Sequence, residues 1–537
     1  MTETSLNLLR APVRGIPHRA SVPGCRDTGT AMLLQRALQG RPMTMSLKQL
    51  LQGMPGIINI RGKETVRVHS ITTDSRRVGP GAMFFAVPGL RTDGHFFINE
   101  AIDRGAQVIV CEKDCWVPPQ VTQVLVKDLR GLIGRVASRF HGQPEKQLEL
   151  TGFLGTSGKT VTSSLLRHFF QAEAPVGLLG TIYYAVGNRT LPAHRTTPEP
   201  IELFGLLSQM KEQACRHVLM EVSAHGIDQG RVEGLQFRNL VLMNLTPEHL
   251  HYHGSLENYI ALEKAFIEKQ GGKLKALVAG LDDPEVNKLL PSLSRAMKGR
   301  VVTFGCVAEA EIRAEEVRYG AADTRFTLHW PGGSLKLVSP LLGAFNLQNV
   351  LAAIACGYLE GRDPAEMGAA LLSFNGVRGR MERLETSSDC TVLVDYMHTE
   401  SAYAKGLEMV RGLTKGRLIT VFGCGGNRDE RTRPVITALV ARLSDVAIAT
   451  SDNPRNETAG AIFEDMRRGN EACANLSYIE DRRTAIAEAI ARAGPGDTVL
   501  IAGKGHETFQ EFGDCVVPFD DRAVAREILQ NRKWQHP

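Results

Sequence analysis

The sequence predicts an α/β protein whose domains are built on parallel sheets. Three observations lead to this fold class. The chain has 537 residues, which is too long for a single hydrophobic core and indicates three or four domains. Short apolar runs alternate with stretches of helical periodicity, as expected for parallel sheets covered by helices. A glycine loop at residues 155–160 stands between one such run and one such stretch.

The composition narrows the classes of partner. Hydrophobic residues make up 43% of the chain and charged residues 23%, which is typical of a globular protein. The net charge of +5 is small for this length, so nucleic acid is not expected as a partner. No apolar run reaches the roughly 18 residues that span a bilayer, so no membrane association is expected. The ten scattered cysteines fit reduced thiols, and we expect a cytoplasmic protein.

The first 45 residues differ from the rest of the chain. They contain six arginines, no lysine and two acidic residues, a composition that a leader segment would have. The alternative is a misassigned start, with initiation at Met43 or Met45, because residues 46–51 read as the beginning of a helix. We exclude residues 1–45 from the fold and expect a first domain over residues 46–147.

A second domain is expected over residues 148–375, and it contains the glycine loop. Residues 148–154 read as a buried strand, and residues 161–171 read as an amphipathic helix. A glycine turn between a strand and a helix points several backbone N–H groups at one spot, which favours phosphate binding.

Two side chains of this loop add to the prediction. Lys159 would place a positive charge at the β- and γ-phosphates, and the Thr160 hydroxyl would be a ligand of Mg²⁺. The loop lacks strict P-loop spacing, because Phe153 occupies the position five residues before Gly158. A glycine-rich surface turn is the alternative interpretation.

Further metal-binding candidates follow two other apolar runs of this domain. Glu221 ends the run at residues 217–221, and a strand beside the loop would bring its carboxylate to the Mg²⁺. An acid that caps a strand end is the alternative. His249, His251 and His253 have the spacing of a zinc cluster, but next to a nucleotide site one histidine on a second Mg²⁺ or on a phosphate is the better interpretation.

A third domain is expected over residues 376–537, again with a parallel sheet. Four strands are expected there, at residues 391–395, 418–422, 446–450 and 498–502. Polar or glycine residues follow each strand, and ligands of open α/β sheets bind beyond the carboxyl ends of the strands. Arg428 and Arg455 lie in two of these segments and suit bidentate capture of a carboxylate, although surface arginines are common.

Taken in order along roughly residues 46–537, these motifs resemble those of the Mur ligase family. The segments that carry the resemblance are residues 74–76, 155–160, 196–198, 220–225, 244–254, 343–349, 379–383, 394–398, 423–428, 452–455 and 503–507. The resemblance implies a three-domain architecture with a central P-loop-type ATPase domain and a C-terminal Rossmann-like domain. It also implies an ATP- and Mg²⁺-dependent amide ligase that forms an acyl phosphate. We expect the protein to be a monomer.

The resemblance also implies roles for individual residues. ATP would contact Gly155, Thr156, Ser157, Gly158, Lys159, Thr160, Val161, Asn346, Asp395 and His398. The catalytic residues would be Lys159, Glu221, His249 and Lys264, and the metal site would comprise Thr160, Glu221, His249 and Lys264. The substrate UDP-MurNAc-L-Ala-D-Glu would contact Ser75, Thr196, Thr197, Ser223, Gln229 and Arg231. The amino-acid pocket would comprise Arg428, Asp452, Asn453, Pro454, Arg455, Gly503 and Glu507.

The Asp452–Arg455 motif goes with family members that use meso-diaminopimelate rather than L-lysine. The physical chemistry agrees, because diaminopimelate carries a second amino-acid head. Arg455 can pair with the distal carboxylate and Glu507 with the distal ammonium. Lysine would leave Arg455 without a partner, and such a site can reject the analogue by roughly 10⁴-fold.

One departure from the family pattern affects the metal site. The family has a lysine four residues after the tyrosine that follows the histidine motif, and carbamylation lets it hold a second Mg²⁺. Here Glu263 stands four residues after Tyr259, and Lys264 comes one later. Either Lys264 is the carbamylated residue on a shifted helix, or Glu263 supplies a carboxylate directly; we prefer Lys264.

Two alternative functions remain open at this stage. A ligase that adds glutamate to a folate would share the nucleotide architecture, but the first domain and the Asp-Asn-Pro-Arg motif argue against it. A nucleotide-binding partner protein without turnover would fit the arginine-rich leader and substitutions such as Glu263 and Ser401.

Overall fold

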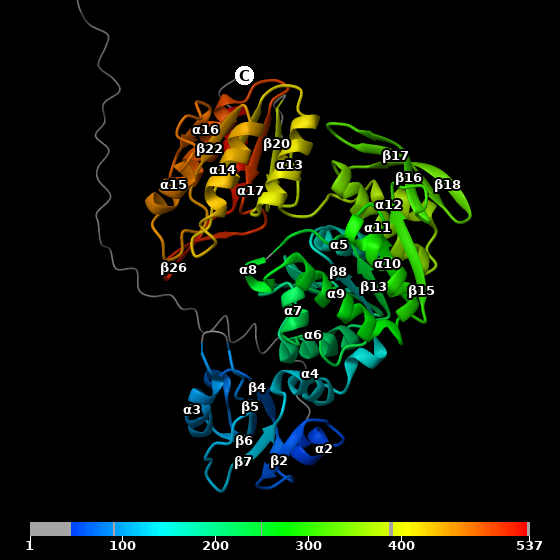
Figure 1. Cartoon of the computed structure of the whole chain (residues 1–537), viewed down its shortest axis with the longest axis vertical. Coiled ribbons are helices and arrows are strands. Elements are labelled where there is room, and N and C mark those ends of the chain that lie inside the picture. The colour runs from blue at the N-terminus through cyan, green and yellow to red at the C-terminus, as the bar shows by residue number, and fades with distance from the viewer. Residues whose placement is uncertain (1–43, 90–91, 249, 386–389, 534–537) are drawn as a thin grey trace, which may run out of the picture.

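The computed structural model describes residues 44–89, 92–248, 250–385 and 390–533. The predicted leader at residues 1–45 therefore lies almost wholly outside the described residues, as does His249. Three sheets follow one another along the chain and form three units, which Figure 1 shows from blue through green to red. Within the described residues, no helix has the length and apolar character needed to cross a membrane.

The first unit is a five-stranded sheet of order β2-β7-β6-β5-β4, in which β4 to β7 are parallel and β2 is antiparallel. Its strands are β2 (Ile57–Arg61), β4 (Ser70–Thr72), β5 (Ala82–Phe85), β6 (Ala106–Cys111) and β7 (Thr122–Val126), beside the pair β1 (Met45–Ser46) and β3 (Arg67–Val68). Its helices are α2 (Leu47–Leu51), η1 (Ser75–Arg77), η2 (Gly94–Phe97), α3 (Ile98–Asp103) and α4 (Leu129–Phe140). The helix expected after Met45 is α2, which begins at a capping box formed by Ser46 and Gln49.

The second unit is an eleven-stranded sheet of order β11-β10-β9-β12-β8-β13-β14-β15-β16-β17-β18. Its strands are β8 (Glu149–Leu154), β9 (Gly177–Leu179), β10 (Tyr183–Val186), β11 (Arg189–Pro192), β12 (His217–Glu221), β13 (Asn239–Leu242), β14 (Ala276–Gly280), β15 (Arg300–Gly305), β16 (Ile312–Tyr319), β17 (Thr324–Trp330) and β18 (Gly333–Ser339). Its helices are η3 (Pro144–Gln147), α5 (Lys159–Phe170), α6 (Pro200–Glu212), α7 (Ala224–Asp228), α8 (Leu250–His253), α9 (Leu256–Gly271), α10 (Pro284–Ala296), α11 (Ala344–Leu359) and α12 (Pro364–Leu371).

The middle of this sheet is parallel, as the sequence predicts, whereas both ends are antiparallel. The sequence analysis does not predict the strands of these two antiparallel ends. Strands β16 and β18 are largely exposed. They therefore lack the continuous apolar runs that mark buried parallel strands.

The third unit is a six-stranded sheet of order β19-β20-β24-β21-β22-β23. Its strands are β19 (Glu382–Leu384), β20 (Thr391–Asp395), β21 (Leu418–Phe422), β22 (Val446–Ala449), β23 (Leu476–Tyr478) and β24 (Thr498–Ala502), followed by the hairpin β25 (Phe509–Phe512) and β26 (Cys515–Pro518). Its helices are α13 (Glu400–Leu413), α14 (Thr432–Leu443), α15 (Ala459–Arg467), α16 (Arg482–Arg492) and α17 (Asp521–Lys533). The four predicted strands are β20, β21, β22 and β24.

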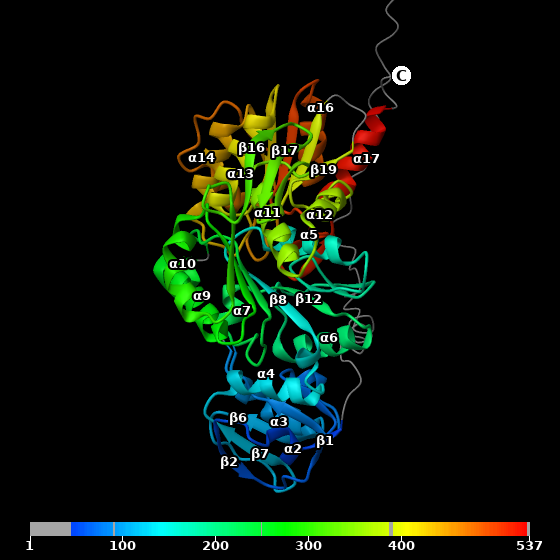
Figure 2. The same cartoon turned by 90° about the vertical axis from the view of Figure 1, so that its right-hand side faces the viewer.

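The hydrophobic core divides differently from the sheets. One cluster runs without interruption from the first sheet through α4 into one face of the second sheet. Figures 1 and 2 both show α4 between the first sheet and α6. The third sheet has separate clusters on its two faces, with Leu393 on one face and Val392 and Val394 on the other. The third unit thus has its own core, and the first two share one.

Candidate active site

The glycine loop closes the carboxyl end of β8 and opens α5. Gly155 and Gly158 have φ angles of 97° and 93°, values that glycine adopts at little cost. A Cβ on Gly158 would lie 2.3 Å from the Asn349 side-chain oxygen, and a Cβ on Gly155 would lie 2.4 Å from the Asn244 carbonyl oxygen. Both glycines are therefore needed for the loop to pack against its neighbours.

Residues that follow β13 hold this loop in place. The Asn244 side chain accepts from the Ser157 backbone N–H at 2.9 Å and donates to the Ser157 carbonyl at 3.0 Å. The Thr156 hydroxyl donates to the Thr246 carbonyl at 2.9 Å and contacts the Tyr259 hydroxyl at 3.2 Å. The loop is thus preorganised by bonds to a neighbouring strand end and to α9.

Lys159 folds back over the loop. Its ammonium donates to the Thr156 carbonyl at 2.9 Å and to the Gly155 carbonyl. A phosphate bound at the loop would compete for this ammonium, because charged phosphate oxygens accept hydrogen bonds more strongly than backbone carbonyls. The side chain is thus positioned to neutralise the charge of a bound phosphate.

Glu221 and Thr160 meet at the mouth of the loop. Strand β12 pairs directly with β8, with Glu221 opposite Phe153, as the sequence analysis expects. The Glu221 carboxylate is 2% exposed and accepts from the Thr160 hydroxyl at 2.9 Å and the Thr181 hydroxyl at 2.8 Å. Hard oxygen donors from three elements converge here, and such donors fit Mg²⁺.

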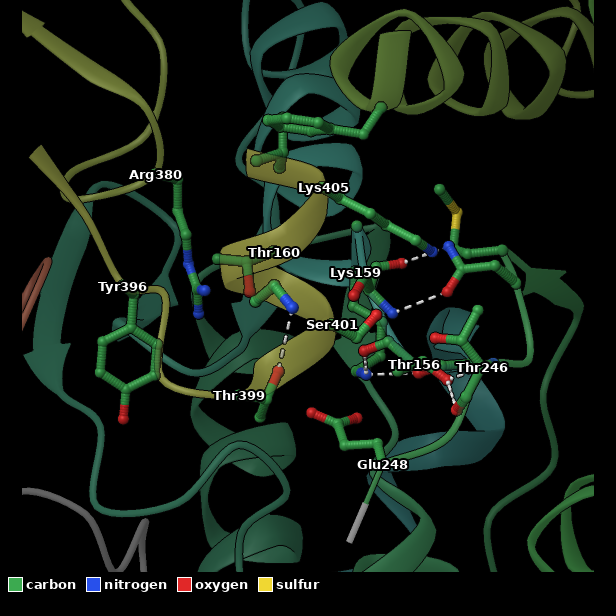
Figure 3. A pocket seen from close by; sticks show the side chains of 18 of the residues that line it. Thr156, Lys159, Thr160, Thr246, Glu248, Arg380, Tyr396, Thr399, Ser401 and Lys405 are labelled. Carbon is green, nitrogen blue, oxygen red and sulfur yellow. Dashed lines mark hydrogen bonds between the residues drawn. The ribbon is translucent and has the colours of Figure 1, made fainter. Parts of the chain in front are cut away.

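A cavity of about 610 Å³ lies between the glycine loop and the third unit. Figure 3 shows its wall, with Lys159 and Thr160 facing the start of α13 and the β20 end. The cavity brings together every residue expected to contact ATP, namely Gly155, Thr156, Ser157, Gly158, Lys159, Thr160, Val161, Asn346, Asp395 and His398. Thr196, Ser223 and Arg428 line the same cavity, so the three predicted groups of contacts adjoin one another.

The third unit lines the cavity with polar side chains. Burial raises the pKa of Asp395 to about 6, although the Arg380 guanidinium opposes this rise. Asp395 accepts from the Met381 backbone N–H at 2.7 Å. Burial also lowers the pKa of His398, whose Nδ1 lies 2.9 Å from the Tyr396 carbonyl oxygen.

Two cations of the cavity wall have no role in the sequence analysis. The Arg380 guanidinium stacks over the Tyr396 ring at 4.8 Å from its centroid, a cation–π contact. Lys405 reaches the cavity from α13, and Figure 3 shows it on the side of Lys159. Arg380 lies inside a quoted motif and could have been assigned from it, whereas no local pattern marks Lys405.

Five of the six residues predicted for the UDP-linked substrate lie together around α7. Thr197 is fully buried, and its hydroxyl donates to the Glu221 carbonyl and contacts the Ser223 hydroxyl. Arg231 donates to the Thr197 carbonyl at 3.1 Å and to the Gln229 side chain at 2.6 Å. Thr196 contacts Thr181 at 3.1 Å. The sixth residue, Ser75, is on η1 of the first unit, where its hydroxyl donates to Glu100.

The residues predicted for the amino-acid pocket meet beyond the carboxyl ends of β21, β22 and β24. The Asn453 amide donates to Glu507 at 2.9 Å and accepts from Lys504 at 2.9 Å, and Lys504 pairs with Glu507 at 2.8 Å. Lys504 is fully buried, so this charge is compensated within the pocket. Sequence reasoning did not assign Lys504 a role.

Arg455 is held at the rim of this pocket by the hairpin β25–β26. Its Nε donates to Glu511 at 2.8 Å, and its Nη1 donates to the Gly426 carbonyl at 2.7 Å. Its backbone is left-handed, with a φ of 54°. Gly503, with a φ of 110°, lets Asp452 approach, since a Cβ there would lie 2.6 Å from the Asp452 carboxylate. Pro454 and Arg428 complete the rim, and Arg428 also lines the main cavity.

Glu263 and Lys264, the two candidates for the metal-binding position on α9, point in different directions. Glu263 faces the glycine loop from α9 and is 1% exposed. Burial raises the pKa of Glu263 to about 7, while the nearby Lys159 ammonium and Gly155 N–H oppose the rise. Lys264 points to the outer side of α9, is 36% exposed and lies 3.6 Å from Glu268. In this structure Glu263, and not Lys264, faces the glycine loop.

Comparison with known protein families covers all three units. The model of the Mur ligase family catalytic domain matches residues 67–141, that of the Mur ligase middle domain matches residues 154–357, and that of the Mur ligase glutamate ligase domain matches residues 379–505. Each match falls on one of the three sheets described above.

A curated relative extends the match over nearly the whole length. The UDP-N-acetylmuramoyl-L-alanyl-D-glutamate–2,6-diaminopimelate ligase of Geobacillus kaustophilus (strain HTA426) is 39% identical over 495 residues, which cover 91% of this chain and 100% of the relative.

Solved structures share all or much of this fold. A structure of a UDP-N-acetylmuramoyl-L-alanyl-D-glutamate–2,6-diaminopimelate ligase superposes with a TM-score of 0.65 at 29% identity, covering 91% of this chain and 100% of its own. A folylpolyglutamate synthase from Mycobacterium tuberculosis reaches a TM-score of 0.59 at 15% identity and covers 70% of this chain and 92% of its own, a likeness of fold alone. The chain belongs to the Mur ligase family.

Proposed function

We propose that this protein is an ATP-dependent amide ligase of peptidoglycan synthesis. It would join meso-diaminopimelate to the γ-carboxylate of the D-glutamate in UDP-MurNAc-L-Ala-D-Glu and form ADP and phosphate. The relatives matched over nearly the full chain carry this activity in their names. The observation in the structure that carries the proposal is the single cavity whose wall includes the glycine loop, Ser223 beside the substrate residues, and Arg428 of the amino-acid rim.

The first step follows from the glycine loop. The loop N–H groups and Lys159 bind the phosphates of ATP, and the γ-phosphoryl group passes to the D-glutamate carboxylate, leaving ADP. An acyl phosphate results, in which the former carboxylate carbon has a good leaving group. Lys159 stabilises the charge on the transferred group, because its flexible ammonium need only exchange two carbonyl partners for phosphate oxygens.

Magnesium is part of this proposal. Thr160 and Glu221 would hold the ion, since their oxygens lie 2.9 Å apart beside the loop. When bound, Mg²⁺ supplies charge neutralisation to the phosphate oxygens. Thr181 keeps the Glu221 carboxylate oriented through two hydrogen bonds.

The second step uses the amino-acid pocket. The amine of diaminopimelate attacks the acyl phosphate carbon, a tetrahedral intermediate forms, and phosphate leaves as the amide bond is completed and the ammonium proton is lost. The free face of the Arg455 guanidinium would take the distal carboxylate of diaminopimelate, and the Glu507 carboxylate the distal ammonium. Glu511 already holds the Arg455 Nε, so the guanidinium is oriented before the ligand arrives.

The two alternatives fit the molecule less well. A folate-type ligase shares the fold with this chain at 15% identity, but the family match at residues 67–141 and the segment 452–455 favour a UDP-linked substrate and diaminopimelate. A nucleotide-binding protein without turnover would need no amino-acid pocket beside the phosphates. We further propose that the enzyme works as a monomer in the cytoplasm.

The proposal is tested by phosphate release from ATP in the presence of UDP-MurNAc-L-Ala-D-Glu and Mg²⁺. Three reactions are compared, with meso-diaminopimelate, with L-lysine and without an amino acid. We expect phosphate and the tripeptide product only with diaminopimelate. Turnover with lysine would retain the ligase and refute the assignment of Arg455. Nucleotide binding without turnover in any reaction would favour the partner protein.

A further inference from the structure

Helix α9 presents one polar stripe to the glycine loop. Tyr259 and Glu263 are four residues apart and therefore lie on the same face of the helix, one turn above the other. The Tyr259 hydroxyl contacts Thr156 at 3.2 Å. The Glu263 carboxylate follows one turn further along, within range of the charge of Lys159.

Glu263 is unusual because its carboxylate is buried without a hydrogen-bond partner among the described residues. Its side chain is 1% exposed, and neither carboxylate oxygen makes a hydrogen bond with the described residues. A buried carboxylate without partners destabilises the folded protein, so such groups are usually paired, protonated or bound to a metal ion. Among the described residues, only the Lys159 ammonium and the Gly155 N–H offset this cost at Glu263.

The charged groups around Glu263 indicate which kind of partner its carboxylate would bind. Lys159 already donates to two loop carbonyls, and Glu248 adds a second negative charge to the environment of Glu263. Figure 3 shows the Glu248 carboxylate facing the cavity on the side of Lys159 and Thr156. The mutual repulsion of Glu248 and Glu263 shows that two carboxylates lie near each other beside the glycine loop, an arrangement that suits a divalent cation.

We propose that Glu263 is a ligand of a divalent cation that binds together with the nucleotide. The inference rests on the proposed function in that it takes the nucleotide to bind at the glycine loop. Glu263 supplies its charge as an unmodified carboxylate, so this metal site needs no carbamylated lysine and no carbon dioxide. Lys264 has no part in the site, because it lies one position further round α9 and is near Glu268.

The test measures metal binding rather than turnover. Mn²⁺ is titrated into the full-length protein with the non-hydrolysable analogue adenylyl imidodiphosphate, and free Mn²⁺ is followed by electron paramagnetic resonance. Glu263→Gln should weaken the binding of Mn²⁺ at least about tenfold, while Glu263→Asp, which keeps the charge, should retain more affinity than Glu263→Gln. Because no ligase product is needed, the result is independent of whether the proposed reaction occurs.

Matched variants on the same helix separate the assignments. Glu268→Gln removes an exposed carboxylate one turn away and should leave the Mn²⁺ affinity unchanged. Lys264→Ala should also leave it unchanged. Loss of Mn²⁺ binding in Lys264→Ala, or unaltered binding in Glu263→Gln, would overturn the proposal.

The thermal unfolding of the ligand-free protein gives a second readout. Glu263→Gln removes an unpaired buried charge, so the variant should unfold at a higher temperature than the unchanged protein and gain less from added Mn²⁺ and nucleotide. A lower unfolding temperature together with an undiminished gain from Mn²⁺ would contradict the proposal.

Glu263→Lys tests whether a negative charge at position 263 is needed for Mn²⁺ binding. The new amine would place a cation beside Lys159, and Mn²⁺ binding should be lost in buffer freed of carbon dioxide. Added bicarbonate should restore binding in Glu263→Lys only, since an amine and carbon dioxide form a carbamate anion with loss of a proton. The unchanged protein should bind Mn²⁺ equally with and without bicarbonate; a requirement for bicarbonate in the unchanged protein would refute the inference.

Discussion

The phosphate cradle, which is the glycine loop with Asn244 and Thr246, is built differently from the amino-acid pocket, of which only Arg428 lines the cavity at the loop. The cradle is held by neutral hydrogen bonds, such as those of Thr156 and Asn244, and keeps its cation ready for a ligand. The pocket is held by charged groups that already neutralise one another, such as Lys504 with Glu507 and Arg455 with Glu511. The cradle can therefore stabilise charge that develops during a reaction, whereas the pocket is preorganised to select its ligand.

The largest effect should come from the cradle. Lys159→Met keeps the length of the side chain and removes the charge that stabilises the transferred phosphoryl group. We expect kcat to fall about 10³-fold and the KM for diaminopimelate to change little. Steady-state kinetics with each substrate varied in turn measure both constants. A large rise in the KM for diaminopimelate would show that the two regions are not separable in this way.

The next effect should come from the pocket. Arg455→Ala removes the partner of the distal carboxylate, and we expect the KM for diaminopimelate to rise about 10²-fold with little change in the KM for ATP. Arg431→Ala is a suitable control, because Arg431 is exposed and paired with Asp429 outside the pocket. An unchanged KM for diaminopimelate in Arg455→Ala would refute the role assigned to this residue.

A smaller effect should follow when Arg455 is retained but its hydrogen bond to Glu511 is weakened. Glu511→Gln weakens the bond to the Arg455 Nε at 2.8 Å while retaining an acceptor oxygen. We expect the KM for diaminopimelate to rise about tenfold, with kcat unaffected at saturation. The double variant with Arg455→Ala should be no worse than Arg455→Ala alone, since Glu511 acts through the arginine. Additive losses would assign Glu511 a separate role.

How well the two regions could be predicted also differs. The cradle is encoded locally: residues 155–160 and the end of β12 identify Lys159, Thr160 and Glu221 from neighbouring sequence alone, because a parallel strand places its last residue beside the loop. The pocket depends on long-range partners. Lys504 and Glu511 are recognisable as important only when the structure shows Asn453 and Arg455 beside them.

The same contrast explains the errors in the fold. Strands such as β8 and β20 are short, mostly buried segments beside turn residues, and the sequence predicts them within a residue of their observed bounds. The edge strands β11, β16 and β18 expose several residues and lack that signal, whereas β10 is mostly buried but only four residues long. The choice between Glu263 and Lys264 depends on the helical phase of α9, which no local sequence pattern fixes and which the contact of Tyr259 with Thr156 sets in the structure.

The smallest predicted effect concerns stability and pH at the border of the two regions. The pKa of Asp395 is raised from 3.8 to about 6 by burial, so the folded state binds the proton more tightly than the unfolded state. The resulting penalty is absent below about pH 4, grows as the pH rises to about 6 and persists above it. Asp395→Asn should therefore unfold with a free energy about 2 kcal/mol higher at pH 8 and show no such gain at pH 3.5. Urea denaturation at the two pH values measures this; an equal gain at both would contradict the assignment.

The central claim is that the cradle activates a carboxylate for attack by an amine held in the pocket. The most direct measurement uses UDP-MurNAc-L-Ala-D-Glu with ¹⁸O in the γ-carboxylate, together with ATP, Mg²⁺ and meso-diaminopimelate, and follows the mass of the released phosphate. An acyl phosphate transfers one carboxylate oxygen to phosphate, so the account predicts one ¹⁸O in each phosphate released with the tripeptide product. Unlabelled phosphate would show that water, not the carboxylate, receives the phosphoryl group, and would contradict the account.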